Sequence, residues 1–164
     1  MLNRILSKEE CAKCRICCCF DSSDIWEAPV ITKSKADEIL ENYNKTQRFL
    51  ENGESFIFDM EKEPDEDLYY CSMLDRENGC VMKDSKPFDC RIWPFRVMDL
   101  NGTLVLTLSP VCPVVKTKAL EELSDFAREL APVVFKQAKA EPVIVKPYIN
   151  GYPILAVNCD GKEN

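Results

Sequence analysis

The sequence predicts a small α+β domain with two main helices, short antiparallel β-hairpins and a cysteine-lined metal centre. Ten cysteines occur among 164 residues, and five of them lie within nine positions near the start of the chain. Two stretches repeat apolar residues at helical spacing, and two Asn-Gly pairs separate short apolar runs, as in hairpins. Because 46% of the residues are apolar, we expect a real core and one domain over residues 1–164.

The first segment is expected to be a short helical lead over residues 1–10. Ser7 and Glu10 have the spacing of a capping box, in which each side chain accepts a hydrogen bond from the other residue's backbone N–H. This arrangement would place the first cysteines at or inside the start of a helix. A loop is expected to follow over residues 20–30, where turn-forming residues are frequent.

The middle of the chain predicts one helix and two strands. An apolar stripe at helical spacing predicts a helix that begins near Thr32 or Ser34 and runs to about Leu50. The Asn52-Gly53 pair would end that helix. Aromatic and β-branched residues predict strands over 55–60 and 68–74.

The last third of the chain predicts two hairpins and the longest helix. The hairpins are expected over residues 95–109 and 143–157, each turning at an Asn-Gly pair. The helix is expected over residues 116–139, with Pro132 kinking or splitting it. We expect the C-terminal helix and hairpin, residues 116–158, to pack on the part of the chain that carries the cysteine pattern.

The first cysteine cluster has the spacing of a metal site. Cys11, Cys14 and Cys17 repeat the C-x-x-C step, so that three thiolates can face one centre. Cys18 follows at once, and neighbouring residues of an extended chain point to opposite sides. Cys17 and Cys18 are therefore not expected to share one mononuclear metal, which leaves two adjoining sites or one polynuclear cluster.

The remaining cysteines of the pattern lie far along the chain. Cys71 and Cys80 flank a polar turn, Cys90 lies in the stretch K-P-F-D-C-R-I-W-P-F, and Cys112 lies between two prolines. Arg91 adjoins Cys90 and is a candidate for stabilising its thiolate. The eight candidate ligands of the metal or cluster are Cys11, Cys14, Cys17, Cys18, Cys71, Cys80, Cys90 and Cys112. Two further cysteines lie outside the pattern and are expected not to be ligands, namely Cys19 and Cys159.

This order of cysteines resembles the YkgJ-like cysteine-cluster family of zinc- or iron-chelating domains. The family pattern is C-x-x-C-x-x-C-C, a C…C pair, and R-P-x-x-C-R-x-x-P, and the match runs from Cys11 to about Cys112. Arg15 stands where the family often has Gly, Ser72 where Pro is common, and Lys86 where Arg is usual. These departures leave the thiols in place, so the resemblance implies a metal-chelating domain.

Charge and composition narrow the function classes. A net charge of −7 and a pI near 4.8 argue against nonspecific nucleic-acid binding. No apolar run has the length of a membrane span, and the N-terminus lacks the apolar core of a signal peptide. We therefore expect a cytoplasmic protein without a membrane partner, in which ten cysteines indicate metal binding rather than five disulfides. The absence of histidine excludes Cys2His2 zinc sites and His-based catalysis.

All-thiolate sites favour iron–sulfur clusters or zinc. The first hypothesis is an iron–sulfur protein, with one polynuclear cluster or two 4Fe-4S clusters, in electron transfer, redox sensing or cluster handling. It would act with a protein partner such as a redox or client enzyme. The alternative is a structural zinc module that mediates protein–protein interaction. No separate catalytic constellation is visible, so enzymatic activity stays open.

Overall fold

The computed structural model describes most of the chain, namely residues 2, 4–21 and 28–159. This part has an α+β fold, as predicted, and it forms two compact units, the N-terminal unit (Met1–Arg91) and the C-terminal unit (Ile92–Asn164). The single domain over residues 1–164 stays a prediction. The loop expected over 20–30 is described only at its ends, because residues 22–27 lie outside the described part.

The N-terminal unit begins with the predicted capping box. The Ser7 hydroxyl accepts from the Glu10 backbone N–H at 3.1 Å, and the Glu10 carboxylate accepts from the Ser7 N–H at 2.9 Å. Helix α1 (Lys8–Cys14) follows and carries the first two cysteines. It ends at Arg15, whose φ of 56° is left-handed, and the chain continues as the 3-10 helix η1 (Ile16–Cys18).

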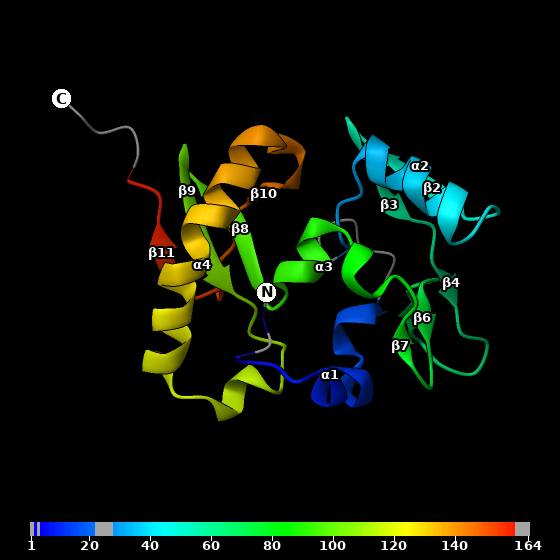
Figure 1. Cartoon of the computed structure of the whole chain (residues 1–164), viewed down its shortest axis with the longest axis horizontal. Coiled ribbons are helices and arrows are strands. Elements are labelled where there is room, and N and C mark those ends of the chain that lie inside the picture. The colour runs from blue at the N-terminus through cyan, green and yellow to red at the C-terminus, as the bar shows by residue number, and fades with distance from the viewer. Residues whose placement is uncertain (1, 3, 22–27, 160–164) are drawn as a thin grey trace. The chain divides into compact units, whose positions relative to one another are not determined.

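The second helix begins as predicted and ends early. In α2 (Lys33–Asn42), the Thr32 hydroxyl accepts a hydrogen bond from a backbone N–H of the first turn. The prediction that this helix continues to about Leu50 is wrong, because it ends at Asn42. The Asn44 side chain accepts from the Thr46 backbone N–H at 3.1 Å, which favours a turn over a further helical turn. Helix α2 packs against β3 of the hairpin that follows (Figure 1).

The segment expected to complete that helix is instead one arm of a hairpin. Strand β2 (Phe49–Asn52) pairs antiparallel with β3 (Ser55–Phe58), and the glycine of the Asn-Gly pair takes the turn at φ 60°. The Phe49 ring lies 6.2 Å from the ring of Phe56 and 5.7 Å from that of Phe58. The last two side chains therefore share a face, as predicted.

The strand predicted over 68–74 is broken in the middle. Its ends form β5 (Tyr69–Tyr70) and β6 (Leu74–Asp75), and Cys71 lies in the turn between them. Strand β6 pairs with β7 (Gly79–Cys80), and β5 is the central strand of the sheet β1-β5-β4. The other elements of the unit are β1 (Cys19–Phe20), β4 (Glu61–Lys62), η2 (Lys83–Ser85) and α3 (Phe88–Ile92).

The C-terminal unit is built on the first predicted Asn-Gly hairpin. Strands β8 (Phe95–Leu100) and β9 (Thr103–Leu108) pair antiparallel over their whole length. Asn101 and Gly102 have φ values of 52° and 83°, which is the left-handed backbone of a type I′ turn. The predicted hairpin is confirmed. The type I′ turn suits it because its backbone twist matches that of the two strands.

The prediction of a second Asn-Gly hairpin, over residues 143–157, is wrong. Strand β10 (Lys146–Pro147) pairs parallel with β8, and β11 (Ile154–Val157) pairs antiparallel with β9, so the two strands lie at opposite edges of the sheet β10-β8-β9-β11. Pro147 and Pro153 have no backbone N–H and cannot complete a ladder between the two segments. Each segment instead extends one edge of the longer β8-β9 hairpin.

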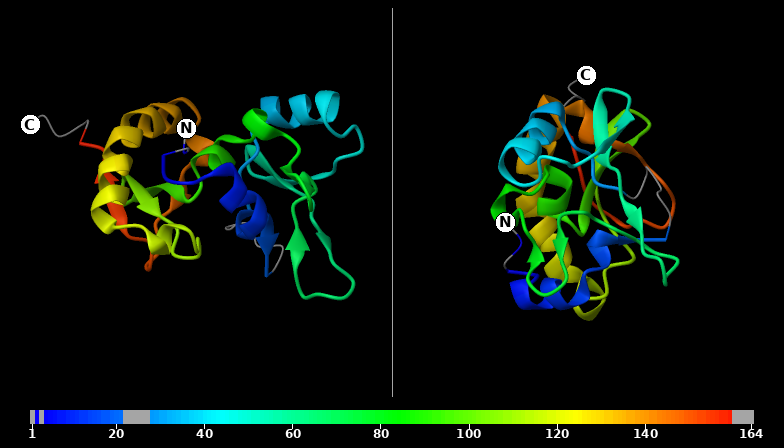
Figure 2. Two further views of the ribbon diagram at one scale, coloured as in Figure 1. Left: turned by 60° about the horizontal axis from the view of Figure 1, so that its bottom comes forward. Right: turned by 90° about the vertical axis from the view of Figure 1, so that its right-hand side faces the viewer.

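Helix α4 (Leu120–Ala140) covers one face of this sheet (Figures 1 and 2). It runs unbroken through Pro132, so the predicted split is not seen. The Phe126 ring packs 5.6 Å from that of Phe95. Leu120 was predicted to belong to the apolar face of this helix, but it is 64% exposed, so this part of the prediction is wrong. The rest of that face is buried, namely Leu123, Phe126, Ala127, Leu130, Val134 and Ala138.

Two 3-10 turns flank the long helix, η3 (Val115–Thr117) before it and η4 (Pro142–Ile144) after it. None of the helices in the described part of the chain combines the length and the apolar character that crossing a bilayer requires.

Candidate metal centre

Four cysteines from three segments of the N-terminal unit lie close enough to influence one another. Burial is the largest reason why the pKa of the Cys90 thiol is well above its ordinary value. The thiols of Cys71, Cys17 and Cys80 raise that pKa further, as neighbouring negative charge does. The chain therefore brings together the four-thiol group, which consists of Cys17, Cys71, Cys80 and Cys90.

Cys18 joins this group through its neighbour. The two sulfurs of Cys17 and Cys18 lie 3.9 Å apart, and their hydrogen bond is the largest cause that raises the pKa of Cys17, followed by burial. The expectation that these side chains point to opposite sides is wrong, because they belong to η1 and not to an extended chain. Two thiolates on one tetrahedral zinc lie about 3.8 Å apart, given a Zn–S bond of about 2.3 Å.

Cys71 is supported by its own turn. Burial raises the pKa of its thiol to about 12, whereas a hydrogen bond from the Met73 backbone N–H to the sulfur acts in the opposite direction. The turn is closed by the Leu74 N–H, which donates to the Cys71 carbonyl at 2.9 Å. The Cys71 N–H donates to the Cys18 carbonyl at 3.0 Å, which ties the first cysteine segment to the second. Amide donors to sulfur are a feature of metal–thiolate sites.

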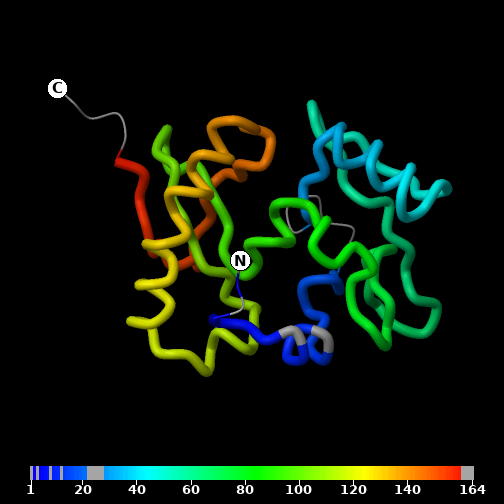
Figure 3. Tube along the Cα trace, viewed as in Figure 1, coloured from blue at the N-terminus to red at the C-terminus, as the bar shows by residue number. Residues whose placement is uncertain are grey.

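Cys80 is presented by the β6-β7 hairpin. The Asp75 carboxylate accepts from the backbone N–H groups of Glu77 at 2.9 Å and Asn78 at 2.6 Å, which fixes the turn. Helix α1 packs beside β7 (Figure 3), so Cys11 and Cys14 lie on the helix next to this strand. Cys11 is exposed, and Cys14 is half-buried like Cys17, Cys80 and Cys90.

The other three cysteines have separate surroundings. Cys112 is buried in the C-terminal unit, so its predicted role as a ligand stays a prediction. Cys19 lies on β1, where burial raises the pKa of its thiol and a hydrogen bond with Tyr70 opposes the rise. Cys159 is exposed in the C-terminal unit, and its thiol donates to the Val157 carbonyl at 3.8 Å.

The cation beside the thiols is Lys86 rather than the expected Arg91. The ammonium group of Lys86 lowers the pKa of both Cys17 and Cys71, although burial and neighbouring thiols outweigh it. The Arg91 guanidinium lies over the ring of Phe88, 5.5 Å from its centroid. The sequence held a signal for this role, because Lys86 occupies the place of the usual Arg in the R-P motif.

A buried carboxylate beside the thiols was not predicted. Asp89 is only 6% exposed, and its Oδ2 accepts from the Val30 backbone N–H at 3.1 Å. Its Oδ1 is buried without a hydrogen-bond partner in the described part of the chain. The negative charge of Asp89 also raises the pKa of Cys90. Such a group is costly to bury unless a cation lies nearby.

The thiols lie near one another, but they do not have the positions of a metal-coordinating site. Within the described residues, no three or more Cys, Asp or Glu side chains already have positions that could hold a metal ion. A cysteine-lined metal centre is therefore not shown. The donor set nevertheless fits a soft metal, because one buried and several half-buried thiols, an amide donor to sulfur and one cation are present. No disulfide joins any of the ten cysteines, all of which lie in the described part.

Comparison with protein-family models, with curated proteins and with solved structures found no match to this chain. The resemblance to the YkgJ-like cysteine-cluster family accordingly stays a prediction from the spacing of the cysteines.

Proposed function

We propose that the N-terminal unit binds a metal centre through cysteine thiolates, and that an iron–sulfur cluster is its occupant. The observation that carries the proposal is the convergence of three cysteine segments: the Cys17 and Cys18 sulfurs lie 3.9 Å apart, the Cys71 N–H donates to the Cys18 carbonyl, and Cys17, Cys71 and Cys80 lie near enough to Cys90 to raise the pKa of its thiol. Crowded, buried thiols resist ionisation when no metal is present. When a metal binds, the thiols release their protons, and the resulting thiolates coordinate the positive ion, which offsets their mutual repulsion.

The number of thiols favours an iron–sulfur cluster. Cys18 lies beside the four-thiol group, so that five thiols are available where a tetrahedral zinc takes four. A polynuclear cluster can use adjacent cysteines on different irons. When bound, such a cluster supplies one-electron chemistry, which suits electron transfer, redox sensing or cluster handling with a protein partner. The reducing cytoplasm is the compartment in which these thiols stay available.

The chain's own residues have distinct tasks in this proposal. The thiolates of the four-thiol group hold the metal, and the Met73 N–H stabilises one of them by a hydrogen bond. Lys86 offsets part of the negative charge that several thiolates bring together. The hydrophobic core that includes Cys71, with Cys18 and Cys80 packed against it, excludes water from one side.

Zinc is the second candidate, and one distance favours it. The separation of 3.9 Å between the Cys17 and Cys18 sulfurs is close to that of two ligands on one tetrahedral ion. In that case the centre would be structural, and the protein would act as an interaction module.

Purification without oxygen distinguishes these outcomes. We expect a coloured protein with iron and acid-labile sulfide in stoichiometric amounts, and we expect the Cys17→Ser variant to lose most of both. Cys159→Ser is the matched control and should keep them, because this thiol lies outside the pattern. A colourless protein with stoichiometric zinc would show that the occupant is zinc and not an iron–sulfur cluster. The proposal would be overturned if the protein bound neither iron nor zinc, or bound either of them only weakly at a single site.

A further inference from the structure

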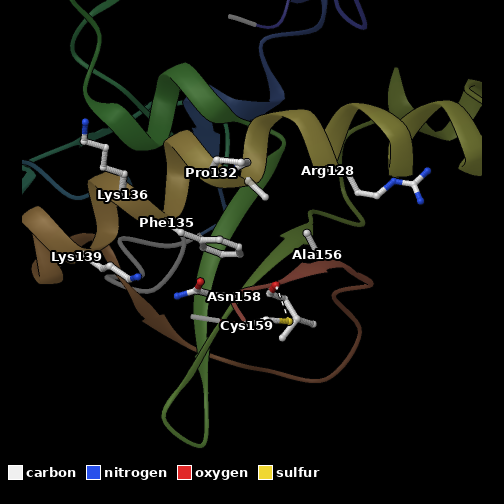
Figure 4. Close-up of a pocket in the computed structure, with 10 residues that line it drawn as sticks. Arg128, Pro132, Phe135, Lys136, Lys139, Ala156, Asn158 and Cys159 are labelled. Atoms are coloured by element: carbon white, nitrogen blue, oxygen red, sulfur yellow. Dashed lines mark hydrogen bonds between the residues drawn. The ribbon is translucent and has the colours of Figure 1, made fainter. Parts of the chain in front are cut away.

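The C-terminal unit contains a groove that the metal proposal does not use. Its volume is about 600 Å³, and it lies between α4 on one side and the end of β11 on the other (Figure 4). The helix contributes Phe135 and Pro132, and the strand side contributes Ala156, Val157 and Cys159. The groove thus combines an apolar floor with the edge of a sheet.

The rim of the groove is basic, in contrast to the chain as a whole. Arg128, Lys136 and Lys139 line it, and none of the described residues that line it is acidic, although the net charge of the chain is −7. Arg128 forms an ion pair with Asp125 one turn away. Lys136 is exposed and makes no ion pair with the residues that the structure describes. The charge of the rim is complementary to an anionic occupant.

The strand side of the groove offers backbone groups. Strand β11 ends the sheet, and no described strand pairs with its outer edge. Val157 is paired with Val105, and the neighbouring Asn158 N–H donates to the Leu104 carbonyl at 2.9 Å. Since hydrogen-bonded positions alternate in an antiparallel ladder, Val157 directs its own N–H and C=O to the outer edge. Among the residues that the structure describes, its carbonyl accepts only the weak thiol hydrogen bond from Cys159, at 3.8 Å.

We propose that this groove binds an extended acidic peptide of a partner protein, which adds to the outer edge of β11 as a further strand. The peptide backbone would pair with the N–H and C=O of Val157, and its carboxylates would meet Arg128, Lys136 and Lys139 from the helix. Small apolar side chains of the peptide would lie on Phe135. A nucleic acid could satisfy the charges but has no backbone that continues a β-ladder, so the sheet edge favours a peptide.

A labelled peptide of alternating Glu and Val, with blocked termini, is the probe. We expect it to bind the full protein in fluorescence anisotropy, with affinity falling as salt rises, whereas a Lys-Val peptide does not bind. Lys136→Glu combined with Lys139→Glu should weaken binding about tenfold, as expected for two exposed charge pairs. Lys116→Glu is the matched control, because Lys116 is exposed in the same unit outside the groove, and it should change affinity by less than about twofold.

Val157→Pro separates strand addition from simple charge attraction. Proline removes the outward N–H but is tolerated on an edge strand, so the fold should be kept, which circular dichroism checks. We expect this variant to lose peptide binding. In the unsubstituted protein, we expect the bound peptide to slow alkylation of Cys159. Unchanged binding by Val157→Pro, equal binding of a single-stranded oligonucleotide, or no binding of the acidic peptide would each overturn the proposal.

Discussion

At the scale of residues, two charged side chains lie near the thiols of the proposed centre. Lys86 is the cation that acts on Cys17 and Cys71, whereas Asp89 acts in the opposite direction on Cys90. A cation favours both thiolate formation and electron uptake by a bound cluster. In the proposed centre, the two side chains would therefore act on the reduction potential in opposite directions.

Lys86→Met should lower the reduction potential of the proposed cluster. Removal of one positive charge costs the reduced state about 1 kcal/mol of Coulomb energy, which is roughly 40 mV for one electron. Redox titration followed by electron paramagnetic resonance measures the shift, and Lys86→Arg, which keeps the charge, should leave it near zero. Equal potentials in the Met and Arg variants would show that the ammonium group does not act on the cluster.

At the scale of elements, the reversal after α1 directs the first cysteine segment. Arg15 ends the helix with a left-handed backbone, and η1 then brings the Cys17 and Cys18 sulfurs together. A non-glycine residue pays a steric cost in this conformation. The Gly that the resembled family often has at this position would adopt it without that cost.

Arg15→Gly should therefore raise the free energy of unfolding by about 1 kcal/mol, whereas Arg15→Val should lower it by a similar amount. Urea denaturation followed by circular dichroism measures both. The Arg15 charge also lowers the pKa of Asp75, so part of the gain in the glycine variant is offset. If Gly were less stable than Val at this position, the side-chain attraction would outweigh the backbone cost.

The β6-β7 turn should respond to acid. Hydrogen bonds from the Asn78 and Glu77 backbone N–H groups lower the pKa of Asp75. A lowered folded-state pKa contributes stability above the unfolded pKa, and this stability is lost as pH falls through the folded value. We expect the Glu77 and Asn78 amide resonances to move together at a pH below the ordinary range of aspartate. Titration of both at the ordinary value would contradict the capped turn.

At the scale of the whole molecule, the sequence predicted what depends on neighbours along the chain. The Ser7–Glu10 capping box and the Asn101-Gly102 turn each need only a few adjacent residues, and both are confirmed. The positions of β10 and β11 at opposite edges depend on competition for the β8-β9 hairpin, which no local pattern encodes. The nearness of Cys17 to Cys90 likewise depends on packing between distant segments.

Metal removal should act on one unit. The N-terminal unit has short strands and several thiols that lie together, whereas the C-terminal unit has a four-stranded sheet and a long helix with a buried apolar face. We expect chelation to abolish hydrogen-exchange protection within residues 28–91 and to leave most of it within residues 92–159. Mass spectrometry of peptides from both ranges checks this. Equal protection with and without chelator would show that metal does not support the fold.

The most direct test of the thiolate centre is X-ray absorption spectroscopy at the edge of the metal that copurifies with the protein. The account predicts a first coordination shell of sulfur alone, at about 2.3 Å. The sulfur occupancy should fall in Cys17→Ser and Cys90→Ser and stay unchanged in Cys159→Ser. A first shell of oxygen or nitrogen at about 2.0–2.2 Å, or full sulfur occupancy after loss of Cys17, would contradict it.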